Sequence, residues 1–230
     1  MHRAYPMIEQ RSMLLRLVGI AVAIALGMLV TDLGGAALRR LFLLENGTVL
    51  RGELWRLVTA HLVNLSRVHT HLNILGLGLI LVSLWSILTP RMLARAILLS
   101  GAAISLGWLA LMPAGVTYVG FSGITHGVMT FGGLVMLRTG PRWFGGLILA
   151  CVAAKLGQEF FNGAVPGADA AIGGRVSFVS HTLGTLGGAL AAREGPFWPR
   201  LGVGLVCLML SLIHAEREAA ALPAAVTADG

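Results

Sequence analysis

Four polar residues of this 230-residue chain have side chains suited to chemistry and stand at the ends of separate apolar runs. Ser122 opens one run, His181 lies just inside another, and His69 and Asn73 open a third. A serine within hydrogen-bond reach of a histidine can be activated as a nucleophile. Polar groups within membrane helices are costly and are usually functional. Because alternating helices would bring all four residues to one side at the same depth, we predict that they form one site.

The residues around the serine fit a nucleophile at the start of a helix. Gly120 and Gly123 flank it in Gly-Phe-Ser-Gly, which permits a tight entry into the helix and leaves the hydroxyl unobstructed. A helix N-terminus also offers free backbone N–H groups and a positive dipole end, which suit an oxyanion hole. His69 and Asn73 are four residues apart, so they share one helix face.

Glycines predict how the serine and the histidine meet. His181, Gly184 and Gly188 fall on one face of their helix, and Gly123 and Gly127 form a similar pair beside Ser122. Pairs of small residues four apart let helix backbones approach closely. We therefore expect the His181 helix to press against the Ser122 helix.

The composition is that of a membrane protein. Hydrophobic residues make up 56% of the chain, charged residues 12%, and the mean hydropathy is +0.82, whereas a soluble domain has roughly 25% charged residues. The net charge of +7 could suggest nucleic acid. However, the arginines sit between apolar runs, so we expect no nucleic-acid partner. The two cysteines have no metal-ligand spacing, and we expect neither a metal nor a cofactor.

Six apolar runs approach the roughly 20 residues that cross a bilayer core as a helix. They extend from about Leu14 to Val30, His69 to Leu88, Met92 to Met112, Ser122 to Leu137, Trp143 to Phe161 and Phe178 to Ala192. We read the first as a spanning helix rather than a signal peptide. A seventh run, Leu201 to Ile213, is short and could either cross or lie at the interface. The expected fold is an all-α membrane bundle of six transmembrane helices. The sequence does not decide whether the seventh apolar helix also spans the membrane.

Arginine placement predicts the orientation of the bundle. Four clusters fall on one side of a six-helix alternation: Arg3, Arg11 and Arg16; Arg91 and Arg95; Arg138 and Arg142; Arg193 and Arg200. The positive-inside rule makes that side, and the N-terminus, cytoplasmic. The long loop of residues 31–68 breaks the pattern, because it places five arginines on the opposite, external side.

The motif set resembles the rhomboid family of intramembrane serine proteases. The residues that carry the resemblance are Trp55-Arg56, His69 and Asn73, Gly120-Phe121-Ser122-Gly123, and Ser180-His181-Thr182-Leu183-Gly184 with Gly188. The resemblance covers a core of residues 14–192, between a cytoplasmic segment of residues 1–13 and a C-terminal apolar segment and tail of residues 193–230. It implies that Ser122 attacks the scissile carbonyl and that His181 takes its proton, as a dyad with no evident carboxylate member. His69, Asn73 and the Ser122 N–H would hold the oxyanion.

A narrower resemblance is to the rhombosortases, a bacterial rhomboid subgroup. It rests on residues 57–63, on residues 118–127, and on Lys155-Leu156 with Glu159. Two positions depart from the family pattern: Asn64 stands where many rhomboids have a further histidine, and Ser180 replaces the usual alanine. The resemblance implies a multi-pass protein of the bacterial inner membrane. Its substrates would be membrane-anchored proteins that end in a Gly-rich motif, an apolar helix and a basic end.

Other polar residues allow more than one interpretation. His126, one turn after Ser122, could support the site or simply pack. Lys155 and Glu159 are four apart, and form either a structural ion pair or a contact with substrate or a gate. We expect His61 at the membrane interface and His214 in solvent.

Two other classes of function compete with a protease. A catalytically inactive rhomboid-like chaperone or binding protein would have lost the serine or the histidine, and this chain has both. A small transporter would usually show repeat symmetry or intramembrane carboxylates, and only Glu159 qualifies.

Overall fold

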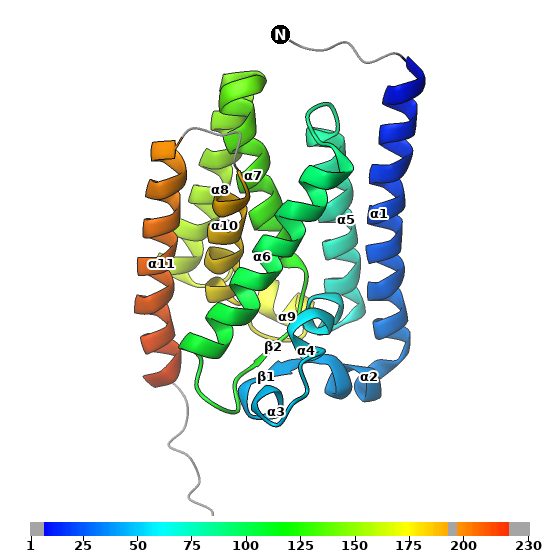
Figure 1. Ribbon diagram of the computed structural model, residues 1–230. Coiled ribbons are helices and arrows are strands. Elements are labelled where there is room, and N and C mark those ends of the chain that lie inside the picture. The colour runs from blue at the N-terminus through cyan, green and yellow to red at the C-terminus, as the bar shows by residue number, and fades with distance from the viewer. Residues whose placement is uncertain (1–6, 193–196, 221–230) are drawn as a thin grey trace, which may run out of the picture.

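The apolar runs fold into helices that pass up and down beside one another (Figure 1). The computed structural model describes residues 7–192 and 197–220, with side chains for residues 9–192 and 201–215. Arg3, Arg193 and residues 221–230, which entered the orientation and tail predictions, lie outside the described residues. The elements are α1 Met7–Leu33, α2 Gly35–Phe42, β1 Leu44–Glu45, α3 Asn46–Leu50, α4 Arg56–Thr59, the 3-10 helix η1 Ala60–Leu62, α5 Arg67–Leu84, α6 Pro90–Leu111, β2 Thr117–Tyr118, α7 Ser122–Thr139, α8 Arg142–Asn162, α9 Ala168–Ile172, α10 Phe178–Ala191 and α11 Phe197–Ala220.

Among the described residues, four helices are long and apolar enough to cross a membrane: Glu9–Leu33 of α1, α5, α6 and α8. The two remaining predicted spans, α7 and α10, are shorter or richer in glycine and pack in the middle of the bundle. The predicted all-α membrane bundle is therefore confirmed. The division into residues 1–13, 14–192 and 193–230 stays a prediction.

Capping residues explain where several helices begin. Ser66 accepts a hydrogen bond from the His69 N–H at 3.2 Å and starts α5, and Ser177 accepts from the Ser180 N–H at 3.2 Å and starts α10. Thr89 caps α6 in an extended conformation immediately before Pro90. A residue before proline avoids the helical region, so α5 cannot continue into α6. It ends at Leu84, four residues before the predicted end.

The segment that was predicted as a long loop, residues 31–68, is folded. It contains α2, α3, α4 and η1, and β1 pairs with β2 in an antiparallel ladder that joins Leu44 to Tyr118. We call the end of the bundle that carries these elements and α9 the loop end, and the opposite end, where α1 begins, the arginine end (Figure 1). The buried Arg56 binds Glu53 at 2.6 Å and donates to the carbonyls of Arg40 and Leu43. The charge of Arg56 is therefore satisfied inside the protein.

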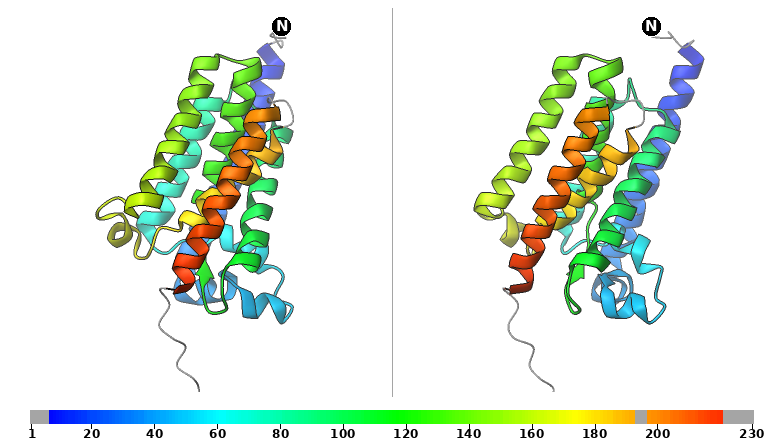
Figure 2. Two further views of the ribbon diagram at one scale, coloured as in Figure 1. Left: turned by 90° about the vertical axis from the view of Figure 1, so that its left-hand side faces the viewer. Right: turned by 60° about the vertical axis from the view of Figure 1, so that its left-hand side comes forward.

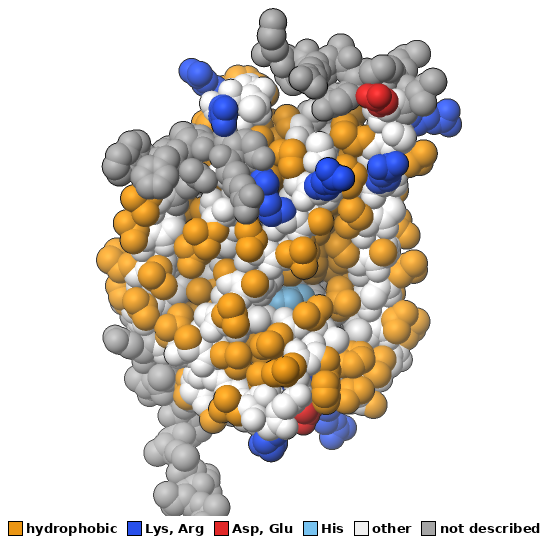
Figure 3. All heavy atoms as spheres, viewed as in Figure 1, with side chains coloured by type: hydrophobic (Ala, Val, Ile, Leu, Met, Phe, Trp, Pro, Cys, Tyr) orange, Lys and Arg blue, Asp and Glu red, His pale blue; other side chains and the backbone are white. Residues whose placement is uncertain are grey.

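Lys and Arg side chains gather at the arginine end, with fewer at the loop end (Figure 3). The described side chains there belong to the starts of α1, α6 and α8 and the end of α7: Arg11, Arg16, Arg91, Arg95, Arg138 and Arg142. Between the two ends, the visible face is largely hydrophobic (Figure 3). A belt of this kind fits a helical bundle that lies in a bilayer.

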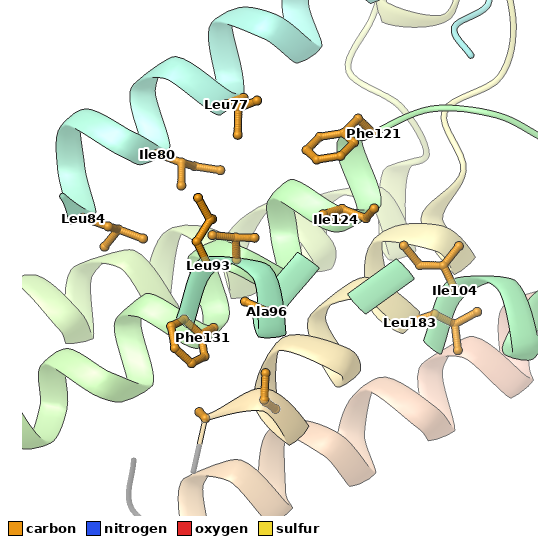
Figure 4. Close-up of a cluster of buried hydrophobic side chains, with 14 of the residues drawn as sticks. Leu77, Ile80, Leu84, Leu93, Ala96, Ile104, Phe121, Ile124, Phe131 and Leu183 are labelled. Atoms are coloured by element: carbon orange, nitrogen blue, oxygen red, sulfur yellow. The ribbon is translucent and has the colours of Figure 1, made fainter. Parts of the chain in front are cut away.

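The core lies between α5, α6, α7 and α10. Figure 4 shows side chains from all four helices pointing into it: Leu77, Ile80, Leu84, Leu93, Ala96, Ile104, Phe121, Ile124, Phe131 and Leu183. The helices α7 and α10 therefore lie in the centre, in contact with each other and with α6 and α8.

The C-terminal helix α11 runs the height of the bundle beside α10 (Figure 2). Its 24 residues span about 36 Å, which is enough to cross a hydrocarbon core. The Ser211 hydroxyl pairs with the Thr182 hydroxyl of α10 at 2.5 Å. The prediction for His214 is wrong: its ring is partly buried and packs on Phe178 with centroids 4.7 Å apart, because α11 continues past the start of α10.

Candidate active site

Ser122 begins α7 at the loop end, where the chain turns sharply. Gly120 has φ +121°, a conformation that side chains rarely adopt, and Phe121 is the N-cap. A Cβ at Gly120 would also lie 3.2 Å from the His69 ring. Glycine therefore allows the turn and the close approach of His69. The first turn of a helix leaves its backbone N–H groups without intrahelical acceptors, so the serine stands beside free donors.

His181 reaches Ser122 from α10. Its Nε2 lies 2.9 Å from the Ser122 Oγ, and the residue is only 4% exposed. The approach depends on the predicted glycine faces. A Cβ at Gly123 would lie 2.6 Å from the Ser180 carbonyl oxygen, and Cβ atoms at Gly184 and Gly188 would overlap the carbonyl oxygens of Gly123 and Gly127. We call these four glycines the glycine seam.

A carboxylate lies on the other side of His181, which corrects the expectation that none was present. Glu159, in the last turn of α8, places Oε2 2.8 Å from His181 Nδ1. Its Oε1 lies 2.8 Å from the Lys155 Nζ. Glu159 is 2% exposed, whereas the Lys155 side chain is 39% exposed. The two residues do form an ion pair, but that pair also contacts the histidine that contacts Ser122.

His126 covers one face of His181. The two rings are stacked with centroids 4.1 Å apart and planes 17° apart. His126 Nδ1 lies 2.8 Å from the Ser122 carbonyl oxygen, and because a carbonyl can only accept, Nδ1 carries the proton. His126 thus packs against the site and is also fixed to the helix that carries the serine.

His69 and Asn73 lie together on one face of α5, near Gly120 and Asn64. The Leu65 N–H donates to His69 Nδ1 at 3.3 Å, so a neutral His69 carries its proton on Nε2. Asn73 Nδ2 donates to the Asn64 Oδ1 at 2.6 Å. Asn64, at the position that departs from the family pattern, is buried and orients the Asn73 amide.

His61 is buried, not at the interface as predicted. Its Nδ1 lies 3.1 Å from the Tyr118 hydroxyl, and its Nε2 lies 3.0 Å from the Ser105 hydroxyl. The Tyr118 hydroxyl donates to the Gly120 carbonyl at 2.5 Å, and Gly120 N–H donates to the Ala60 carbonyl. Burial lowers the pKa of His61 to about 4 and raises the pKa of Tyr118. A neutral His61 therefore links the folded loop to the turn before Ser122.

A comparison with protein-family models shows the family of this chain. A family model described as the Rhomboid domain matches residues 51–193, more than half of the chain. The chain belongs to the rhomboid family. Rhomboids are in general intramembrane serine proteases. No curated protein and no solved structure matched the chain in the corresponding searches.

The rhomboid match contains every residue of the candidate site, from Asn64 to His181, and leaves out α1 and α11. The structure brings together the predicted Ser122, His181, His69 and Asn73 with Gly120 and Gly123. It also brings His126 and Glu159 onto His181, with Lys155 behind Glu159.

Sequence reasoning missed the position of Glu159 beside the histidine. The available signal was a carboxylate in an apolar helix, two residues before the predicted end of its span and therefore near the depth of Ser122 and His181. An ion pair with Lys155, four residues earlier, also explained a carboxylate at this depth. The sequence therefore did not point from Glu159 to His181. His61 was missed because nothing local to it shows that residues 31–68 fold.

Proposed function

We propose that this rhomboid protein is an active intramembrane serine endopeptidase in which Ser122 is the nucleophile and His181 the base. The observation that carries the proposal is the 2.9 Å contact between Ser122 Oγ and His181 Nε2. Both residues are held by the glycine seam in the centre of the bundle. A nucleophile and base that are already within hydrogen-bond distance meet the geometric requirement for covalent catalysis.

The proposed reaction follows from these contacts. The Ser122 Oγ–H proton moves to His181 Nε2 as Oγ bonds to the carbonyl carbon of the scissile peptide. The C–N bond then breaks, and the leaving amine takes the proton from Nε2. Water attacks the remaining ester, gives a proton to Nε2, and releases the new carboxyl terminus as the Ser122 hydroxyl regains its proton.

Donors around the nucleophile would hold the negative oxygen of the tetrahedral intermediate. The candidates are the Ser122 N–H at the start of α7, the Nε2–H of His69, and the second N–H of the Asn73 amide. Asn64 Nδ2 is a buried donor with no partner within residues 7–192 and 197–220, so it could assist beside Asn73. Loss of one such donor typically lowers kcat about 100- to 1000-fold.

The orientation of the bundle in the membrane is part of the proposal. The arginine end would be cytoplasmic by the positive-inside rule, and the site at the loop end would be external. We propose a multi-pass protein of the bacterial inner membrane with a cytoplasmic N-terminus. The α2–α4 segment and α9 would lie near the external membrane surface.

We further propose a substrate of the rhombosortase type, a secreted protein with a Gly-rich motif followed by an apolar helix and a basic end. A substrate helix must unwind before its carbonyl reaches Ser122, and glycine is about 1 kcal/mol worse than alanine in a helix. Glycine also permits close backbone approach. A cavity of about 320 Å³ is lined by Leu65, Trp108, residues 116–119, which lead to Gly120, and residues 175–177, which lead to α10. It offers room for such an extended segment.

The test has two arms. The purified protein in lipid vesicles should cut a Gly-rich transmembrane reporter, and Ser122→Ala should lower the rate by at least about 10⁴-fold without changing the folded yield. In cells, mass spectrometry should find shortened C-termini on Gly-rich-tailed proteins only when the enzyme is present. Unchanged C-termini would remove the substrate proposal. Equal cleavage by Ser122→Ala, or no activity against any membrane reporter, would remove the protease proposal and favour an inactive rhomboid-like binding protein.

A further inference from the structure

The polar residues behind His181 form a chain that ends on the nucleophile. Lys155 Nζ contacts Glu159 Oε1, Glu159 Oε2 contacts His181 Nδ1, and His181 Nε2 contacts Ser122 Oγ, each at 2.8 or 2.9 Å. The contacts use both oxygens of the carboxylate and both nitrogens of the imidazole. A chain of this kind restrains every group in it.

The contact with Glu159 decides which nitrogen of His181 carries the proton. An ionised carboxylate accepts hydrogen bonds and cannot donate them. Nδ1 therefore carries the proton, and a neutral ring presents the lone pair of Nε2 to the Ser122 hydroxyl. A general base needs this tautomer, because the opposite one would point an N–H at the group whose proton it must take.

A structural ion pair with Lys155 does not account for the position of Glu159. Glu159 is almost fully buried, while its lysine partner is more than a third exposed. Buried carboxylates are costly and require compensating contacts. An ion pair that served folding alone could place Glu159 on the exposed side of α8, next to the ammonium. Instead, one oxygen faces inward onto the edge of the His181 ring.

The His181 ring is restrained from two directions. Glu159 holds its edge through Nδ1, and the stacked ring of His126 covers its face. His126 fixes the plane of the ring, but stacking does not distinguish between the two nitrogens. Only Glu159, among the groups described around His181, can select the tautomer.

We propose that Glu159 is the orienting acid of a Ser122–His181–Glu159 triad, and that Lys155 holds its second oxygen. This inference rests on the proposed protease function. As Ser122 attacks, its proton moves to Nε2, and the ring becomes an imidazolium next to the Glu159 carboxylate. Glu159 stays ionised and transfers no proton. Nε2 then gives its proton to the leaving amine, and the carboxylate again faces a neutral ring.

The test compares Glu159→Gln and Glu159→Asp with the wild type in the vesicle assay. An amide at position 159 can donate to Nδ1 and so favour the wrong tautomer. We expect Glu159→Gln to lower kcat by about 10²- to 10⁴-fold with KM changed less than threefold. Glu159→Asp keeps the charge, and should retain at least tenfold more kcat than Glu159→Gln.

Asp169→Asn is the matched control. Asp169 and Glu159 line the same cavity of about 370 Å³, and Asp169 accepts from the Val176 N–H rather than from a histidine. Like Glu159→Gln, the Asp169→Asn substitution removes one carboxylate charge near the loop end. We expect its kcat to stay within about threefold of the wild type.

A spectroscopic readout reports the tautomer in the wild type and does not depend on turnover. In ¹⁵N-histidine-labelled wild type, the His181 signal, assigned by its loss in His181→Gln, should show a protonated Nδ1 and an unprotonated Nε2. A proton on Nε2 instead, or a Glu159→Gln variant with wild-type kcat, would overturn the triad and leave the protease intact. Wild-type cleavage no faster than that of Ser122→Ala would remove the protease and the triad together.

Discussion

His181 has two neighbouring helices that hold it in different ways. On the α7 side, the glycine seam lets two backbones touch, and the position of Ser122 follows from helix packing. On the α8 side, contact with the imidazole is made by one side chain, Glu159, with a lysine behind it. The contact of His181 with α7 is therefore set by close packing of the two backbones, and its contact with α8 by a charged hydrogen bond.

The difference separates two tasks that a serine protease needs. Backbone packing sets the distance from nucleophile to base, because helices in a close-packed interior move little. A charged hydrogen bond sets the orientation and tautomer of the base, which packing does not control. Changes on the α7 side should alter the distance from Ser122 to His181. Changes on the α8 side should alter the orientation and tautomer of the His181 ring.

A large effect on both activity and stability should come from the glycine seam. A methyl group at Gly184 would overlap the Gly123 carbonyl oxygen, so Gly184→Ala must push α10 away from α7. We expect a loss of about 1–3 kcal/mol in stability and about a 100-fold fall in kcat, because 1 Å of misplacement has that scale of effect. Vesicle cleavage rates and thermal denaturation in detergent measure both.

Gly157→Ala is the matched control for the seam. Gly157 lies in α8 with no atom within 4 Å of the position of an added Cβ. We expect unchanged cleavage and a stability change of no more than about 1 kcal/mol. Equal effects of the two alanine substitutions would mean that close helix approach does not set the site.

A smaller effect should follow from removing the lysine behind Glu159. Lys155→Met leaves one carboxylate oxygen without its cation in a dry setting, and we expect about a tenfold fall in activity or folded yield. Adding Glu159→Gln should restore folded yield, because no charge is then left unpaired, but should not restore kcat. Phe161→Leu, at an exposed position of the same helix, is the control. A silent Lys155→Met in both assays would show that the lysine only extends towards the interface.

A further effect, on stability rather than on cleavage, concerns the loop that supports the turn before Ser122. The folded-state pKa of His61 is lowered to about 4 from 6.5, so the unfolded chain binds a proton more readily. The contribution of His61 to stability should be complete above pH 6.5, fall as the pH drops from 6.5 to 4, and level off below that. The loss is on the order of 3 kcal/mol.

His61→Gln tests this pH dependence by thermal denaturation between pH 7 and 4. The variant should be less stable at pH 7 but should lose less stability on acidification than the wild type. His71→Gln, at an exposed histidine of α5, should leave the wild-type slope unchanged. The same slope in all three proteins would contradict the role of a neutral His61.

The sequence could predict whatever depends on local pattern. Apolar runs located the spans, and glycines at helical spacing predicted the contact of α7 with α10, because both signals repeat within one helix. The nucleophile motif and the histidine motif were also local. The starts of α7 and α10 were predicted correctly, whereas the predicted end of α5 was four residues too late because a turn precedes Pro90.

The sequence could not predict contacts that depend on how distant segments meet. Glu159 and His181 are 22 residues apart, on helices joined by α9 and its flanking turns. No local pattern in either segment predicts that the end of α8 contacts the start of α10. His61 and Tyr118 are 57 residues apart, and their contact exists only because residues 31–68 fold beneath the loop before α7.

The central claim is that the contact between Ser122 and His181 makes Ser122 a nucleophile. Site-mapped labelling with a fluorophosphonate tests it most directly, because the reagent bonds to an activated serine and needs no substrate. We predict one adduct per chain, located on Ser122 by peptide mass spectrometry, and none in folded Ser122→Ala or His181→Gln. Labelling at another serine, or undiminished labelling of Ser122→Ala, would contradict the account.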